Sequence, residues 1–260
     1  MIHFTISFAG AGRVAGALCR EMFRSGIKIR QIVSESVSDG KPLADECMAV
    51  WSSELSFDDN NHVVIVAVPD HKLKDVLSAI KCSENCVVAH TAGSYGLDVF
   101  PAGIKRKGVF YPLQTFSKGR AVDFKNLPFL LESSDKESGD ILSNLAVTIG
   151  GKVHYTDSGK RKMVHLAAVF FNNFTNYMVT AGSEIANRAD ISPDIFEPLI
   201  RETIFKALEN GPERSQTGPA VRNDINTIEM HLKLLSFSPE LQNLYREITD
   251  SIIRHYTKLR

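Results

Sequence analysis

The sequence lacks the features that mark several large classes of protein. Its 30 acidic residues balance its 30 Lys and Arg residues, which argues against nucleic acid or an anionic membrane as the main partner. No apolar run approaches the roughly 20 residues that span a bilayer, and we expect no signal peptide before the first strand. The four cysteines join no histidine cluster, so we expect no metal site and interpret them as thiols of a reducing compartment. These absences favour a soluble, cytoplasmic protein that acts on a small molecule.

What the sequence does have is a glycine-rich turn near its start. Gly10 and Gly12 follow a stretch of low charge, 2–8, and precede apolar residues at helical spacing. A Gly-x-Gly-x-x-Ala turn between a buried strand and a helix is the form of the dinucleotide-binding fingerprint. The glycines allow a tight turn and a close approach of backbone amides to a pyrophosphate, and the helix N-terminus adds partial positive charge. We therefore assign five residues to the cofactor site: Gly10, Gly12, Arg13, Val14 and Ala15.

The end of the second expected strand, 27–33, leaves the choice between NAD and NADP open. A carboxylate at this place binds the ribose 2′-hydroxyl of NAD, whereas small polar or basic residues accept the 2′-phosphate of NADP. Glu35 lies about 20 residues beyond the fingerprint, which suits NAD, but serines flank it and Lys41 can also reach a phosphate. We assign to the cofactor site Ser34, Glu35 and Ser36, together with Val68 and Pro69 at the end of the next strand.

Strand and helix patterns alternate up to about residue 155, with buried-strand patterns such as 62–68 and a last strand at 152–155. This alternation predicts an α/β fold, a doubly wound, mainly parallel sheet of the Rossmann type over residues 1–155. Helices are expected within it at 42–50, 72–80 and 136–149. From residue 156 onward strand patterns cease, and helices are expected at 158–188, 193–208, 224–235 and 239–256, with 215–219 irregular. We therefore predict an all-α domain over 156–260 that binds substrate and forms a homodimer.

Polar residues follow several of the expected strands, where the loops of a parallel sheet line the ligand crevice. Asp70 is either a cofactor contact or, as we favour, the N-cap of the helix over 72–80. Thr91 and Gln114 follow the next two strands. We assign Thr91 and Gln114 to the substrate site, against the alternative that their loops are ordinary connections.

The long helix over 158–188 carries the candidates for proton transfer. His165 is the best of them, because its unperturbed pKa lies near neutral pH. Asn173 follows eight residues later, about 80° around an α-helix, where it can orient a substrate oxygen. The alternative is that His165 is a structural histidine between helices.

Further along the chain, Arg222 is suited to a bidentate grip on a substrate carboxylate, or else to a salt bridge with Asp224. We interpret Asp224 as an N-cap rather than a catalyst. His231 lies among apolar residues of a helix and is expected to be a satisfied interhelical histidine.

Four stretches, 10–16, 90–93 with 111–116, 165–173, and 217–224 with 231–232, resemble one family. It comprises Rossmann-like oxidoreductases with a helical C-terminal domain of unknown function, within the superfamily of 6-phosphogluconate dehydrogenase-like enzymes and ketopantoate reductases. The resemblance implies that the long helix of the second domain supplies catalytic polar residues facing the nicotinamide, and it makes Lys162 an alternative proton donor. The chain departs from the family at Tyr111, where His is usual, and at Asn223, where Gly is usual.

These observations together predict an NAD(P)-dependent oxidoreductase. It would transfer hydride to a small carbonyl compound, a 2-oxo acid similar to ketopantoate, in the cleft between the domains. Two alternatives remain at this point: an imine reductase resembling pyrroline-5-carboxylate reductase, and a nucleotide-binding sensor without catalysis. The departure at Tyr111 makes a proton-transfer role at that position doubtful.

Overall fold

The structure is a computed structural model that describes residues 4–258, and the chain divides into two compact units. The first unit extends to Asn173 and holds the sheet, and the second begins at Phe174 and is helical. The predicted domain boundary at 155/156 coincides with the end of the last strand. The first unit extends further because the helix that follows, α5 (Ser158–Ala168), is anchored to the sheet.

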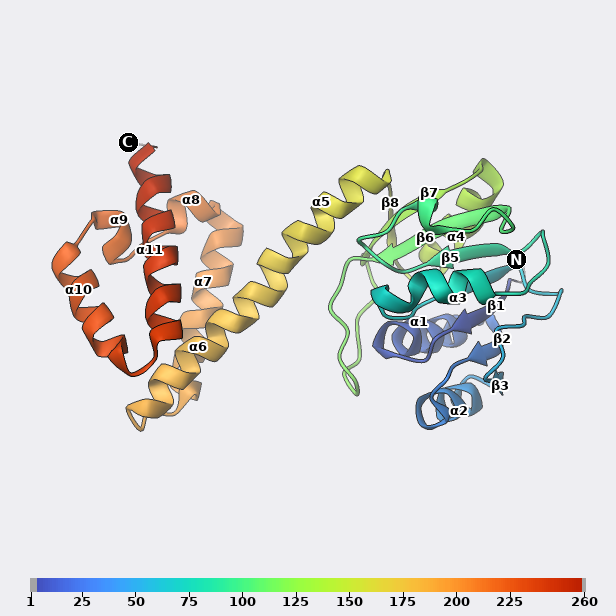
Figure 1. The fold of residues 1–260 in the computed structure, drawn as a ribbon, viewed down its shortest axis with the longest axis horizontal. Helices are drawn as coiled ribbons and strands as arrows, with labels where there is room; N and C mark the ends of the chain where they lie inside the picture. Colours follow the sequence, from blue (N-terminus) through green and yellow to red (C-terminus); the bar gives the residue numbers. More distant parts are fainter. Residues whose placement is uncertain (1–3, 259–260) are drawn as a thin grey trace. The chain divides into compact units, whose positions relative to one another are not determined.

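The first unit is built on an eight-stranded sheet with the order β3-β2-β1-β4-β5-β6-β7-β8. All neighbouring strands are parallel except β6 and β7, which are antiparallel. The predicted doubly wound, mainly parallel Rossmann sheet is therefore confirmed (Figure 1). The strands are β1 (Thr5–Ala9), β2 (Lys28–Val33), β3 (Val50–Ser52), β4 (Val63–Val66), β5 (Val87–His90), β6 (Arg106–Pro112), β7 (Pro128–Ser133) and β8 (Lys152–Tyr155).

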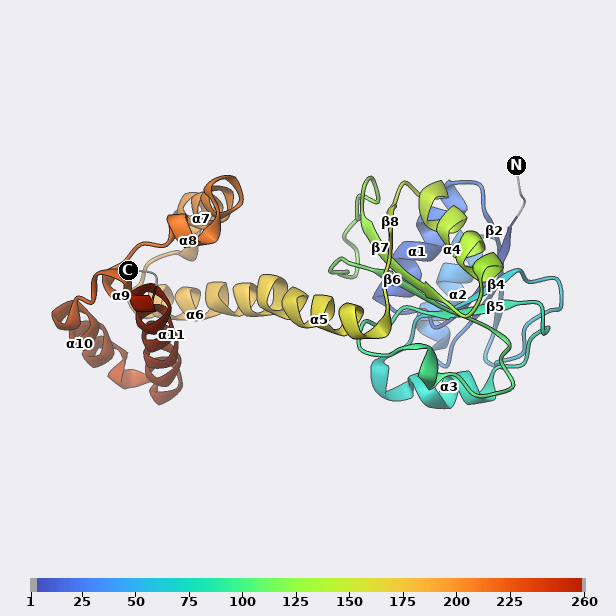
Figure 2. The same ribbon diagram turned by 90° about the horizontal axis from the view of Figure 1, so that it is seen from above.

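Helices cover both faces of this sheet (Figure 2). One face packs against α1 (Arg13–Arg24), α2 (Val37–Glu46) and α4 (Lys136–Thr148), and its core includes Phe8, Leu18 and Leu142. The other face packs against α3 (Leu73–Ala79) and the short helix η2 (Leu97–Val99). Alternate residues of β4 point into the two cores, as expected for a strand buried on both faces.

The helix predicted at 42–50 is wrong in its limits, because α2 begins five residues earlier. Ser36 is the N-cap and accepts a hydrogen bond from the Asp39 amide at 3.2 Å, so the helix starts there and carries Pro42 inside it. Trp51 lies in β3, a strand of three residues at the edge of the sheet. A strand this short leaves almost no periodic signal in the sequence.

The long helix expected over 158–188 is interrupted by the π-helical segment η3 (Val169–Phe174), which separates α5 from α6 (Thr175–Arg188). The predicted start of α5 is confirmed, because the Asp157 side chain caps it by accepting from the Lys160 amide. A π segment takes more residues per turn than an α-helix. The 80° offset expected between His165 and Asn173 is therefore wrong.

Up to residue 258, the second unit continues from α6 through helices only. They are η4 (Pro193–Phe196), α7 (Glu197–Asn210), α8 (Pro212–Ser215), α9 (Pro219–Arg222), α10 (Ile225–Leu234), η5 (Leu235–Phe237) and α11 (Pro239–Lys258). The stretch expected to be irregular at 215–219 is irregular only at 216–218, because Ser215 ends α8 and Pro219 begins α9. No helix within residues 4–258 combines the length and the apolar character that crossing a membrane requires.

Two side-chain roles expected in this unit are confirmed. Asp224 caps α10 by accepting from the Thr227 amide, and His231 lies 2.8 Å from the Tyr245 hydroxyl of α11. Asn223 has a left-handed backbone with φ of 55°, a conformation that glycine and asparagine adopt most readily. The departure from glycine at this position therefore preserves the local backbone.

Candidate cofactor and active site

The glycine turn between β1 and α1 has the geometry that phosphate binding needs. Gly10 has φ of 109°, and a Cβ at this position would overlap the carbonyl group of Ala67 and approach Val68. Gly12 is the N-cap of α1 and makes no side-chain hydrogen bond there, so the first amides of the helix remain available to an anion. Ala15 is fully buried against the sheet. These residues fit a dinucleotide pyrophosphate.

The residues after β2 are held by contacts within the protein. The Ser34 hydroxyl accepts from Trp51 Nε1 at 3.2 Å and donates to the Ser36 carbonyl at 2.9 Å. The Glu35 carboxylate, which is exposed, forms an ion pair of 2.6 Å with Lys72, and this lysine lowers the pKa of Glu35. The Glu35 carboxylate, which would suit a ribose diol, is thus paired with a lysine of the segment η1 (Asp70–Lys72). This segment follows the loop after β4.

A cavity of about 590 Å³ begins at the glycine turn. Residues of α1, of α2 and of the loop between β6 and β7 line it. Its lining includes Gly12, Arg13, Asp39 and Lys118, and the last two form an ion pair of 3.0 Å. The lining includes the first turns of α1 and α2, and helix N-termini are suited to a phosphorylated ligand.

At the carboxyl end of β6, Tyr111 and His165 form a pair across 54 residues of sequence. The Tyr111 hydroxyl lies 3.1 Å from Nδ1 of His165 on α5, and the two rings meet edge to face. Gly93, in the loop after β5, lies under the imidazole: a Cβ on Gly93 would lie 2.7 Å from Nδ1. The strand end, the loop and the helix therefore bring a phenol and an imidazole together.

Asp70 lies close to this pair, and its predicted role as an N-cap is wrong. The 3₁₀ segment that it opens has Pro69 at its N-cap, and the Asp70 carboxylate instead accepts a hydrogen bond from the Ser94 hydroxyl. Burial, with a smaller contribution from the Asp70 charge, raises the pKa of Tyr111. The tyrosine therefore keeps its proton at neutral pH and can donate it.

Sequence reasoning missed Arg161, which is fully buried one helical turn before His165. Its guanidinium donates to the Glu132 carboxylate of β7 at 2.6 Å and to the Tyr95 carbonyl at 2.6 Å. Glu132 also accepts from the Ser158 hydroxyl at 2.9 Å. These bonds fix the first turn of α5 on the sheet and so position His165. Nothing in the sequence distinguishes this arginine from the exposed lysines beside it.

The remaining predicted residues are only partly brought together. Thr91 directly follows β5, the strand that pairs with β6, and donates its amide to the Val66 carbonyl. Gln114 is exposed, and its side-chain oxygen accepts from the amide of the next residue. Lys162 and Asn173 are exposed on their helical segments. Arg222 ends α9 in the helical unit, and its role with a substrate carboxylate stays a prediction.

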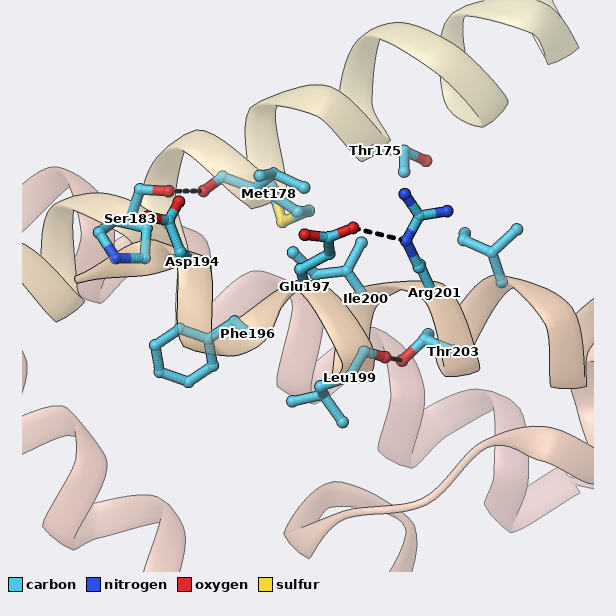
Figure 3. A pocket seen from close by; sticks show the side chains of 14 residues that line it. Thr175, Met178, Ser183, Asp194, Phe196, Glu197, Leu199, Ile200, Arg201 and Thr203 are labelled. Carbon is cyan, nitrogen blue, oxygen red and sulfur yellow. Dashed lines mark hydrogen bonds and ion pairs between the residues drawn. The ribbon is translucent and has the colours of Figure 1, made fainter. Parts of the chain in front are cut away.

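The helical unit has a cavity of its own, of about 700 Å³, lined by α6, η4 and α7 (Figure 3). Its walls are largely apolar, with Met178, Leu199 and Ile200 among them, and the pair Glu197–Arg201 lies at 2.8 Å on α7. Such a surface offers hydrophobic contact but few groups for chemistry. Within residues 4–258, no three His, Cys, Asp or Glu side chains gather as a metal site would require.

Comparisons with known proteins find separate family matches for the two halves of the chain. Residues 5–93 match the family described as NADP oxidoreductase coenzyme F420-dependent, and residues 127–252 match a domain of unknown function, DUF2520. No curated protein has a sequence significantly similar to this one.

Solved structures resemble the chain over nearly its whole length. A Bacteroides fragilis protein assigned as an NADP oxidoreductase is 36% identical, with a TM-score of 0.89 and coverage of 97% of this chain and 98% of that one. A Thermotoga maritima protein is 24% identical, with a TM-score of 0.71 and coverage of 98% and 100%. A reductive aminase from Aspergillus terreus, solved with NADPH and ethyl-5-oxohexanoate, is 12% identical, with a TM-score of 0.70 and coverage of 97% and 94%. The last two likenesses show the fold alone.

Proposed function

The chain belongs to the family of NADP oxidoreductases that join a Rossmann sheet to a helical domain of unknown function, and we propose that it reduces a small 2-oxo acid with NADPH. When bound, NADPH supplies the hydride. The turn at Gly10–Gly12 and the start of α1 hold the pyrophosphate, and Val68 and Pro69 flank it at the end of β4. A ketopantoate-like substrate is the specific candidate that the family resemblance suggests.

The observation that carries the proposal is the hydrogen bond between Tyr111 and His165. Reducing a carbonyl group requires a proton at its oxygen as well as hydride at its carbon. In our proposal Tyr111 donates its hydroxyl proton to that oxygen. His165 donates from Nδ1–H to the phenol oxygen and replaces the lost proton, while its Nε2 takes up a proton from water. The raised pKa of Tyr111 keeps the acid protonated until hydride arrives. Asn173 and Lys162 are the further candidates for orienting the substrate and donating a proton.

The test is NADPH oxidation against a panel of 2-oxo acids and a cyclic imine. Tyr111→Phe and His165→Ala should each lower kcat for the accepted 2-oxo acid by about 100-fold or more, since general acid catalysis contributes that much. The matched control is Tyr155→Phe, which removes a hydroxyl from an exposed tyrosine of β8 and should leave kcat unchanged.

The same panel separates the alternatives. A protonated imine needs no further proton, so an imine reductase would accept the cyclic imine and tolerate Tyr111→Phe. If both site variants oxidise NADPH with the accepted 2-oxo acid as fast as the wild type, the assignment of the proton donor is wrong. Lys162→Ala then tests the remaining proton donor, and Asn173→Ala tests the residue expected to orient the substrate oxygen.

A homodimer is also part of our proposal. Helix α7 has no buried residue, and Leu199, Phe205 and Leu208 are 62%, 64% and 80% exposed. Such an apolar surface is costly in water and is typical of an interface that a second copy covers. Light scattering should give a dimer mass for the wild type and a monomer mass for Phe205→Glu. The four free cysteines fit a reducing compartment, and we propose the cytoplasm.

A further inference from the structure

We infer that the 590 Å³ cavity beside α1 selects NADP by binding its 2′-phosphate through Arg13, Lys118 and Arg120. Lys118 and Arg120 lie on the loop between β6 and β7, at exposed positions where neither motif nor periodicity singles them out. This inference rests on the proposed use of NADPH and adds the residues that would distinguish it from NADH.

The charges around the cavity leave a cationic surplus. Of its charged lining residues, five are cations and three are carboxylates. Two ion pairs on α1 and α2 balance two of the carboxylates: Arg20–Glu46 at 2.7 Å and Arg24–Glu21 at 3.8 Å. Asp39 pairs with Lys118, whereas Arg13 and Arg120 have no ion-pair partner within residues 4–258. Two uncompensated guanidinium groups match the charge of a phosphate near neutral pH.

The position of these cations agrees with the course of a dinucleotide over the sheet. In a Rossmann domain the pyrophosphate lies on the first turn of the first helix, and the adenosine ribose lies beyond the end of the second strand. Arg13 is the first residue of α1, and Asp39 is in the first turn of α2, just after Ser36. The cavity lining includes both Arg13 and Asp39, so in this inference the ribose 2′-phosphate lies in the cavity and meets its cations.

Contacts across the cavity show how the loop is held there. The Lys118 ammonium reaches Asp39 across 79 residues of sequence, and with the Ser36 hydroxyl it lowers the pKa of that carboxyl. Glu35, whose carboxylate would repel a phosphate, is instead neutralised by Lys72 at 2.6 Å. The site therefore has one carboxylate, Asp39, that competes with a 2′-phosphate for Lys118.

The test measures binding without turnover. Calorimetry gives the dissociation constants of adenosine 2′,5′-bisphosphate and of 5′-AMP, which differ only in the 2′-phosphate. Lys118→Ala and Arg120→Ala should each weaken binding of the bisphosphate about ten-fold, the loss typical of one hydrogen bond to a charged group, and leave 5′-AMP unchanged. Lys125→Ala, which removes a lysine of the same loop outside the cavity lining, is the matched control and should change neither constant.

Asp39→Asn separates phosphate binding from a purely structural role of the loop. If Lys118 binds the 2′-phosphate, removing its competing carboxylate should tighten the bisphosphate complex. If Lys118 only fastens the loop to α2, Asp39→Asn should weaken binding as Lys118→Ala does, and the inference is overturned. Equal losses for the bisphosphate and 5′-AMP would overturn it as well.

The wild type distinguishes this inference from the proposed function. Quenching of the single tryptophan, Trp51, by NADPH and NADH reports cofactor binding in the sheet unit. A wild type that binds neither cofactor refutes the proposed function itself. A wild type that prefers NADPH, and retains that preference in the Lys118→Ala and Arg120→Ala variants, refutes only the role of this cavity.

Discussion

Replacing Arg161 with Met should destabilise the sheet unit by about 3 kcal/mol. The guanidinium is fully buried and donates two hydrogen bonds of 2.6 Å, one to Glu132 and one to the Tyr95 carbonyl. Methionine fills much of the same space, so the cost comes from the partners left behind rather than from a cavity. Breaking a buried ion pair by removing one partner typically costs about 3–5 kcal/mol.

The lower end of that range applies for two structural reasons. The Glu132 side chain is 18% exposed and still accepts a hydrogen bond from the Ser158 hydroxyl, so its carboxylate is not left without a partner. Nε of Arg161 is buried without a hydrogen-bond partner in the wild type. This unsatisfied donor lowers the net free energy that the arginine contributes to folding. The expected loss is a large part of the stability of a typical domain.

The assay is urea unfolding followed by the fluorescence of Trp51, which reports on the sheet unit. Arg20→Met is the matched control, because it breaks the Arg20–Glu46 pair, whose side chains are 42% and 48% exposed, and should cost about 1 kcal/mol or less. Adding Glu132→Gln to Arg161→Met should recover part of the loss. A loss for Arg161→Met no greater than that of the control would refute the view that this arginine anchors α5.

Three further predictions follow from the site and its surroundings. Gly10→Ala should abolish NADPH binding measured by calorimetry, because φ of 109° and the overlap with the Ala67 carbonyl exclude a Cβ; binding like the wild type would contradict the assigned turn. Gly93→Ala should displace His165 and lower kcat while the dissociation constant of NADPH stays the same; an unchanged kcat would argue against the pair. Burial lowers the pKa of His90 to about 4, below its unfolded value near 6.5. The neutral imidazole therefore contributes its full share to the free energy of unfolding above pH 6.5. That free energy should fall by about 3 kcal/mol as the pH drops to 4. Urea unfolding at several pH values should show this slope for the wild type and a smaller one for His90→Gln.

Patterns confined to short stretches of sequence predicted much of the fold. The Gly10–Ala15 turn, the alternation of strands and helices, and the cap Asp224 depend on interactions within a few residues. Their physical causes are backbone freedom, apolar periodicity and the satisfaction of helix-end amides. These can be predicted from residues that are close in sequence.

The site was less predictable, because its contacts join residues that are distant in sequence. The general chemistry of histidine identifies His165, but its partner Tyr111 lies 54 residues away, and no local pattern links the two residues. The 80° offset for Asn173 failed because a π segment is not visible in apolar periodicity.

The sequence by itself thus determined that a dinucleotide turn stands between a buried strand and a helix. Gly10 takes a backbone conformation there, with φ of 109°, that glycine adopts far more readily than other residues. Only the tertiary structure decided which charges are buried, paired or left over. Arg161 is buried against Glu132, Glu35 is neutralised by Lys72, and Arg13 remains beside the cavity. Electrostatic roles are set by distance and solvent exposure, and these arise only when separate elements pack together.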